Sequence, residues 1–129
     1  MLDRYFQAAS RFNSDVVVRV SSDCPLVDPQ LADLVMRTYL DGRQRFDYVS
    51  NDFPTRTFPL GLDVEVVSFS ALKTAWEDDK NPKWREHVTP YFYRHLEKFR
   101  LHGVVNDVDL SRMRWTVDTC KDLEFVRRV

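Results

Sequence analysis

Two hydrophobic spacings alternate along the chain. Short runs rich in valine and aromatic residues, bounded by Asp, Ser, Pro or Gly, are typical of strands, whereas apolar residues three and four positions apart are typical of helices. The predicted strands are 15–20, 46–50, 62–69, 99–105 and 113–117. The predicted helices are 2–12 and the stretches that begin at Asp28-Pro29, Ser70, Asn81-Pro82 and Thr119, with an interruption at Pro90. Because strands alternate with helices, this order predicts an α/β sheet with helices on both faces.

Local signals refine several of these elements. The β-branched run at 15–20 is of the kind that a buried parallel strand uses. Asp28 precedes a proline, which is the usual order of an N-cap and a first helical residue. Ser70 is the predicted cap of the next helix. Thr119 caps the last one, with Asp122 at the third helical position as a weaker form of the capping box.

Composition restricts the class of protein. At 129 residues the chain fits one domain, and a net charge of −1 with scattered Lys and Arg gives no support to binding of nucleic acid or an anionic membrane. The two cysteines lack CxxC spacing, and neither a signal peptide nor an apolar run long enough to cross a bilayer is recognisable. Three scattered glycines form no phosphate-binding loop. These features predict a reduced, cytoplasmic protein.

An aspartate follows each of two apolar runs. Asp23 lies just beyond 16–20, and Asp118 directly follows 113–117. If both runs are neighbouring strands, the two carboxylates meet at one edge of the sheet, where ligands bind in open α/β folds. Paired carboxylates suit a hard cation such as Mg²⁺. The competing interpretation is that each aspartate only caps a turn or a helix.

Six segments, in order and over essentially the whole chain, carry a resemblance to a known family. They are 2–5 (LDRY), 18–29 (VRVSSDCPLVDP), 47–51 (DYVSN), 61–65 (GLDVE), 85–90 (REHVTP) and 115–119 (WTVDT). Together they resemble the spore-coat polysaccharide branch of the CMP-sugar cytidylyltransferases, which is akin to the acylneuraminate and 3-deoxy-manno-octulosonate cytidylyltransferases. The resemblance is specific for the family and not for one sugar.

The resemblance implies a glycosyltransferase-A-like, Rossmann-like fold with a mixed sheet flanked by helices. It also implies transfer of CMP from CTP to a sugar hydroxyl, with release of pyrophosphate, in the biosynthesis of cell-surface polysaccharide. The expected acceptor is an acidic sugar or a sugar of a surface polysaccharide. Mg²⁺ is the implied cofactor, and Asp23 and Asp118 match the family's catalytic, metal-binding aspartates.

Two groups of polar residues are candidates for binding the sugar. Asp63 and Glu65 lie two apart on a predicted strand, so their side chains share a face and can hydrogen-bond hydroxyls; a solvated strand face is the alternative. Arg56 lies in the proline-rich loop before them, where it can contact substrate or simply be solvated.

The second group is Arg85, Glu86 and His87, near the start of a predicted helix. An arginine there can bind a sugar carboxylate through two parallel hydrogen bonds. A surface cluster of salt bridges explains the same residues equally well.

The sequence also departs from the family pattern. Family members begin with a strand and a basic, glycine-containing loop that grips the CTP phosphates and base, and this sequence begins after that half. We therefore expect residues 1–129 to form a single, partial domain, whose partner is the missing N-terminal half or a second copy in a homodimer. The alternative function is a non-catalytic, truncated relative that binds a partner or a sugar. Ser22 replaces a usual glycine, which would add a small strain if φ there is positive.

Overall fold

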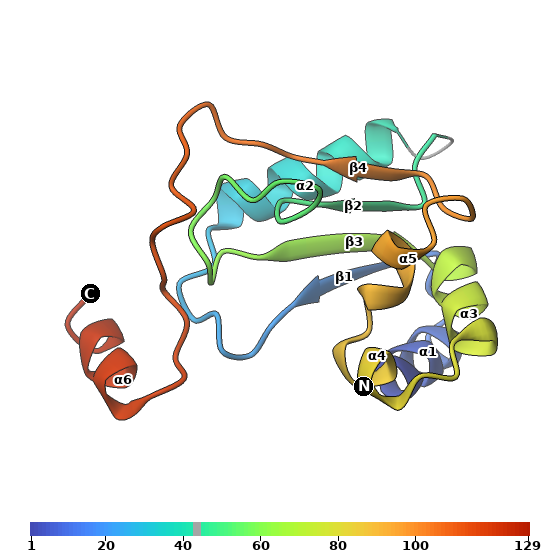
Figure 1. Ribbon diagram of the computed structural model, residues 1–129, viewed down its shortest axis with the longest axis horizontal. Helices are drawn as coiled ribbons and strands as arrows, with labels where there is room; N and C mark the ends of the chain where they lie inside the picture. Colours follow the sequence, from blue (N-terminus) through green and yellow to red (C-terminus); the bar gives the residue numbers. More distant parts are fainter. Residues whose placement is uncertain (43–44) are drawn as a thin grey trace.

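The computed structural model describes residues 1–42 and 45–129 (Figure 1). Its helices are α1 (Leu2–Arg11), α2 (Pro29–Asp41), α3 (Phe69–Asp78), α4 (Pro82–His87), α5 (Pro90–Arg94) and α6 (Cys120–Val126). Its strands are β1 (Val16–Val20), β2 (Tyr48–Ser50), β3 (Val64–Ser68) and β4 (Leu101–Gly103). The alternation of strands and helices predicted from the sequence is confirmed.

The strands form one mixed sheet in the order β1-β3-β2-β4. Strand β3 is antiparallel to both of its neighbours, and β2 and β4 are parallel. The prediction that 15–20 is a buried parallel strand is wrong. Strand β1 is antiparallel to β3 at an edge of the sheet, and its Val18 and Val20 side chains are 44% and 38% exposed. A β-branched run fits an edge strand as well as a central one, because β-branched side chains pack well on any pleated surface that is at least half-buried.

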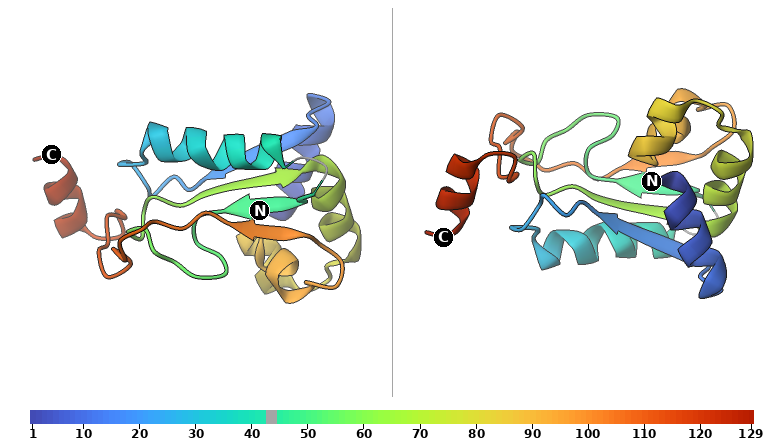
Figure 2. Two further views of the ribbon diagram at one scale, coloured as in Figure 1. Left: turned by 90° about the horizontal axis from the view of Figure 1, so that it is seen from above. Right: turned by 90° about the horizontal axis from the view of Figure 1, so that it is seen from below.

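Helices cover both faces of the sheet, as predicted. Figure 2 shows α2 on one face and α4 and α5 on the other. The core under α2 contains Leu31, Val35, Tyr39, Val49, Leu62, Val64, Val66 and Val104. The core of the opposite face, shared by α1, α3 and α5, contains Leu2, Ala9, Tyr48, Val67, Ala71, Leu72, Ala75, Val88, Tyr91, Phe92 and Phe99. Alternate strand residues enter opposite cores because successive side chains of a strand point to opposite faces.

The prediction of a strand at 113–117 is also wrong. These residues lie beside the loop before β3, and only one isolated parallel bridge, between Leu60 and Arg114, joins the two segments. The apolar alternation has a different cause, because Trp115 packs against the core under α2 and Thr116 is buried without a strand ladder. The other strands are shorter than predicted at their ends.

The caps agree with the sequence at two of three helices. Asp28 accepts a hydrogen bond from the Gln30 amide at 2.8 Å, and the capping box of α6 is complete. The cap of α3 is Ser68 and not Ser70, because the helix begins directly where β3 ends; Ser68 accepts from the Ala71 amide at 3.1 Å.

The C-terminal segment, residues 104–129, leaves β4 at one edge of the sheet. It crosses the end of the sheet and reaches the side of β1, where α6 projects (Figure 1). Helix α6 has no buried residue. In the described part of the chain, no helix is long and apolar enough to cross a membrane.

Candidate active site

The candidate site lies at the end of the sheet where β1, β2 and β4 finish and β3 begins. The loop after β1 carries Asp23, which is half-buried, and Cys24, which is 5% exposed. The Cys24 thiol lies 3.7 Å from Asp23 Oδ1, as a weak donor. The described residues with positive φ are Asn13, Gly61 and Val88, so Ser22 has an ordinary backbone and the strain considered for it does not arise.

A backbone hydrogen bond brings the second aspartate to this loop. The Val117 amide donates to the carbonyl of Asp23 at 2.9 Å, and Asp118 is the next residue. Leu60 fixes the approach of this segment, because its amide donates to Met113 at 2.9 Å and its carbonyl accepts from Trp115 at 2.7 Å. A loop contact therefore joins the segments that carry the two aspartates, and the adjacent strands that the sequence suggested do not occur there.

The carboxylate of Asp118 is exposed and held from one side. Its Oδ2 accepts from Arg114 Nη1 and from Thr116 Oγ1, each at 2.7 Å, and the side chain is 56% exposed. Arg114 also pairs with Asp122, whose Oδ2 accepts from the backbone amides of Asp118 and Thr119. Although desolvation opposes it, hydrogen bonds from the Thr119 hydroxyl and from these two amides, with the charge of Arg114, lower the pKa of Asp122. Asp122 is therefore ionised, and through Arg114 it helps to fix the position of the Asp118 side chain.

Asp63 and Arg56, both predicted from the sequence, are paired beside Asp23. Arg56 donates to both carboxylate oxygens of Asp63, and its Nη2 lies 3.6 Å from Asp52 Oδ2. Burial lowers the pKa of Arg56, but the hydrogen bonds and charge of Asp63, together with the charge of Asp52, raise it more, so the guanidinium is charged. Both Asp23 and Asp63 act on the Cys24 thiol, which places them at the same end of the sheet.

Glu65 lies inside the fold. Its side chain is 5% exposed; Oε2 pairs with Arg19 Nη1, and Oε1 accepts from the Tyr48 hydroxyl at 2.7 Å. Burial, and then the Glu65 carboxylate, raise the pKa of Tyr48 well above its usual value, so its hydroxyl stays protonated and donates. Both Glu65 oxygens have protein partners, so the contacts of this side chain are structural.

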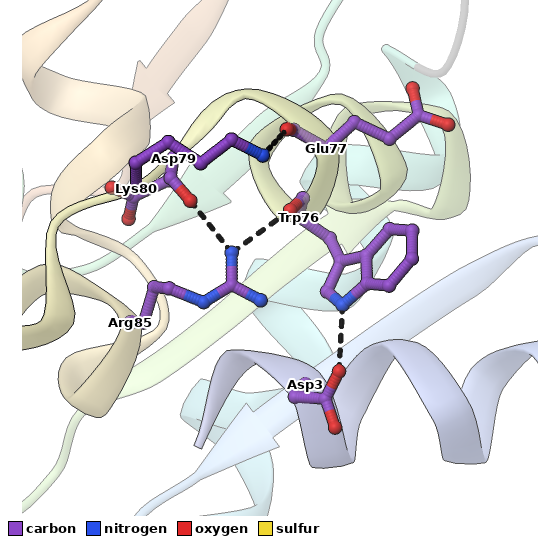
Figure 3. A pocket seen from close by; sticks show the side chains of 6 residues that line it. All are labelled: Asp3, Trp76, Glu77, Asp79, Lys80 and Arg85. Atoms are coloured by element: carbon purple, nitrogen blue, oxygen red, sulfur yellow. Dashed lines mark hydrogen bonds between the residues drawn. The ribbon is translucent and has the colours of Figure 1, made fainter.

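The Arg85 group lies at the opposite end of the sheet, on α4 (Figure 1). Arg85 Nη1 donates to the carbonyls of Trp76 and Asp79 at 2.9 and 2.8 Å and so ties α4 to the end of α3 (Figure 3). The pocket around it, about 490 Å³, is lined by Asp3, Trp76, Glu77, Asp79, Lys80 and Arg85. Glu86 lies 4.0 Å from the N-terminal amine, and His87 is exposed. None of the three approaches Asp23.

Sequence reasoning missed Arg114 and Asp52. Arg114 lies four residues before Asp118, in an Arg-x-Thr-x-Asp pattern that places alternate side chains on one face of an extended segment. That spacing was a usable signal. Asp52 follows β2 and reaches Arg56 only through the course of the loop, which no local pattern reveals.

A chemical prediction follows from the setting of Cys24. Burial, reinforced by the Asp23 and Asp63 carboxylates, raises the pKa of this thiol to about 11. Cys24 should therefore stay protonated at pH 8 and react with iodoacetamide at least about ten times more slowly than the exposed Cys120. Mass spectrometry of partly labelled protein measures this ratio, and equal labelling of the two cysteines would contradict the geometry.

The raised pKa of Cys24 also affects stability. Because the folded state keeps the thiol proton at a pH where the unfolded state loses it, the free energy of unfolding should fall as the pH rises from about 9 toward 11.

Comparisons with known proteins agree with this arrangement. The sequence profile of a family described as Cytidylyltransferase matches residues 1–128. The chain belongs to the cytidylyltransferase family. A solved structure of a cytidylyltransferase from Leptospira borgpetersenii matches 98% of this chain with a TM-score of 0.92 and 36% identity, which confirms the fold expected from the resemblance.

Two curated relatives of this cytidylyltransferase-family chain are informative. An uncharacterized protein of Methanocaldococcus jannaschii is 38% identical over 96% of the chain, and the spore coat polysaccharide biosynthesis protein SpsF of Bacillus subtilis is 28% identical over 98% of it. These matches cover 49% and 52% of the two relatives, and the Leptospira match covers 52% of that chain. The chain therefore spans about half the length of the proteins it matches.

Proposed function

We propose that this chain provides the metal-binding and sugar-binding side of an enzyme that transfers CMP from CTP to a sugar. In that reaction the sugar hydroxyl oxygen attacks the α-phosphorus, the bond from this phosphorus to the bridging oxygen breaks, and pyrophosphate leaves while the hydroxyl proton passes to solvent. Family membership supports the reaction class. The name of the Bacillus relative supports a product used in polysaccharide biosynthesis.

The observation that carries the proposal is the hydrogen bond from the Val117 amide to the Asp23 carbonyl, which joins the loop after β1 to the segment that carries Asp118. Mg²⁺ takes one or two protein carboxylates and completes its shell with water and substrate phosphates. Half-buried Asp23 and exposed Asp118 fit this ligand set. No group of three or more His, Cys, Asp and Glu side chains suited to an all-protein site occurs in the described residues, and such a site is not needed.

Each side chain then has a separate task. Asp23 and Asp118 would hold Mg²⁺, which supplies positive charge that neutralises the phosphates and orients the α-phosphorus. Arg114 would keep the Asp118 carboxylate in a fixed position, since it donates to Asp118 and Asp122 together. The paired Arg56 and Asp63 offer a cation and hydroxyl acceptors to an acidic sugar.

Titration calorimetry tests the metal site. We expect CTP to bind in the presence of Mg²⁺, and Asp23→Asn to weaken this binding at least about ten-fold because a charged ligand is lost. Asp33→Asn is the matched control, since Asp33 is an exposed aspartate on α2 paired with Arg37 at 2.7 Å; it should leave the affinity unchanged.

Binding that is equally strong in EDTA, or equal in both variants, would contradict the assignment. A folded chain that binds a sugar or a protein partner but not CTP would instead favour the non-catalytic module. A screen of CTP with acidic sugars, read by pyrophosphate release, then tests transfer itself.

A further inference from the structure

The two oxygens of the Asp118 carboxylate have different surroundings. Oδ2 accepts hydrogen bonds from Arg114 Nη1 and from the Thr116 hydroxyl, each at 2.7 Å. A carboxylate oxygen offers two lone pairs, so these two donors fill Oδ2. Within residues 1–42 and 45–129, no protein group donates a hydrogen bond to Oδ1. Oδ1 is therefore the oxygen that a ligand can reach on this partly exposed side chain.

The Thr116 hydroxyl is held in one orientation. Thr116 is 7% exposed, and its Oγ1 also accepts a hydrogen bond from Arg114 Nη1 at 2.7 Å. Because a guanidinium only donates, the single hydroxyl proton of Thr116 is left to point at Asp118. If the carboxylate turned away, a buried hydroxyl would lose its acceptor, which costs more than the loss of an exposed contact.

Asp122 fixes the main chain on the other side of Asp118. Its Oδ2 accepts from the backbone amides of Asp118 and Thr119 at 3.0 and 2.8 Å, and its Oδ1 pairs with Arg114. The backbone and Oδ2 of Asp118 are both held by the protein itself. The carboxylate is left with one open oxygen and little freedom to turn.

This arrangement bears on which cation the site accepts. Ca²⁺ takes about six to eight oxygens at about 2.3–2.6 Å and can use both oxygens of one carboxylate. Mg²⁺ requires a nearly ideal octahedron at about 2.0–2.1 Å and is usually bound by one or two carboxylates together with water and phosphate oxygens. A carboxylate whose Oδ2 is filled can serve as a ligand through one oxygen only. Binding of Ca²⁺ through both oxygens would have to displace the Thr116 hydroxyl or the Arg114 guanidinium.

We propose that Thr116 is a positioning residue that keeps Asp118 as a one-oxygen ligand, and that it thereby makes the site select Mg²⁺ over Ca²⁺. The inference rests on the proposed metal site at Asp23 and Asp118, and it adds the reason for the choice of cation. Thr116 has this effect because its hydroxyl is buried. The Arg114 side chain is 43% exposed, so its guanidinium can follow the carboxylate as it turns.

Calorimetric titration with CTP, in excess Mg²⁺ or in excess Ca²⁺, measures this selectivity as the ratio of the two dissociation constants. We expect residues 1–129 to bind CTP at least about ten times more tightly with Mg²⁺. Thr116→Val removes the hydroxyl with little change of shape. It should shift the ratio toward Ca²⁺ about ten-fold, which is the loss expected for one hydrogen bond to a charged group. Thr116→Ser keeps the hydroxyl and should keep the ratio.

Thr74→Val is the matched control. Thr74 lies on α3, at the opposite end of the sheet (Figure 1), and its hydroxyl donates to the Ser70 carbonyl at 3.1 Å. The same group is removed far from the site, so the ratio should stay unchanged. Circular dichroism checks the folding of each variant. An unchanged ratio in Thr116→Val would overturn the inference, as would equal ratios in Thr116→Ser and Thr116→Val, since packing and not the hydroxyl would then be responsible.

A second measurement needs no metal. Because the Thr116 hydroxyl is buried and donates to Asp118, its proton should exchange slowly with water in the metal-free chain and give an observable NMR signal. Rapid exchange of this proton would overturn the inference whatever the result with CTP.

The two proposals fail in different ways. If CTP does not bind to folded residues 1–129, or binds equally well without a divalent cation, the proposed metal site is wrong and the inference falls with it. If binding depends on Mg²⁺ and the Mg²⁺ to Ca²⁺ ratio is the same in Thr116→Val, only the inference is wrong.

Discussion

Replacing Glu65 by alanine is expected to destabilise the fold by about 3–5 kcal/mol. The carboxylate is almost fully buried and has two partners, the Arg19 guanidinium and the Tyr48 hydroxyl. Removal of the acid leaves a partly buried cation and a fully buried hydroxyl without their acceptor, and such groups carry most of the penalty when a buried pair is broken. Denaturant unfolding, followed by circular dichroism, measures the change in the free energy of unfolding.

Glu77→Ala is the matched control. Glu77 lies 3.9 Å from Lys73 in an exposed i,i+4 pair on α3, and such pairs contribute roughly 0.3–0.5 kcal/mol. The double variant Arg19→Met with Glu65→Leu removes both charges, and it should recover part of the lost stability because no unpaired ion remains. If Glu65→Ala and Glu77→Ala destabilise equally, the buried contact is not what stabilises this part of the sheet.

The same variants decide between two roles for Glu65. A sugar ligand would change sugar affinity with little effect on unfolding, whereas a structural acid changes unfolding first. The sequence could not distinguish these roles, because the spacing of Asp63 and Glu65 predicts a shared strand face in either case, although β3 begins only at Val64. What separates them is the position of Arg19 on the neighbouring strand, which is set by the register that pairs Arg19 with Glu65.

Local patterns predicted the elements of the fold well, and long-range contacts less well. Valine runs and the caps at Asp28 and Thr119 depend on nearby residues, and the structure agrees with them. The parallel placement of β1 was wrong because strand direction depends on the order of strands in the sheet, which period-two alternation does not encode. The extended segment at 113–117 shows the same limit, since its alternation reflects packing of Trp115 and Thr116 and not a ladder.

The sequence predicts those residues of the candidate site that directly follow a predicted strand. A backbone hydrogen bond joins the segments that carry Asp23 and Asp118, whereas the two adjacent strands expected to bring the carboxylates together are not formed. The match of residues 85–90 to the family pattern did not by itself predict where Arg85 lies in the fold. Its guanidinium binds the carbonyls of Trp76 and Asp79 at the end of α3, since α4 packs beside α1 and α5 and not beside the loop after β1.

Gly61→Ala is expected to destabilise the protein by roughly 2–4 kcal/mol and to separate Asp118 from Asp23. Gly61 has φ +104, and a Cβ there would lie 2.8 Å from the carbonyl carbon of Trp115 and 2.9 Å from the Thr116 nitrogen. Those are backbone atoms, so no side-chain rotation relieves the contact. Residues 104–129 must move away from the loop before β3, which strains the bond from Val117 to Asp23.

Amide hydrogen exchange at Val117 reports that separation directly and should accelerate in Gly61→Ala. Thr55→Ala, an exposed change in the same loop that adds no atoms, is the control and should leave the exchange unchanged. If both aspartates must act together, magnesium-dependent CTP binding should weaken in Gly61→Ala although neither carboxylate has been altered. Unchanged protection and stability would show that the loop accommodates a side chain, and the close approach of Gly61 to Trp115 would then not be what holds Asp118 in place.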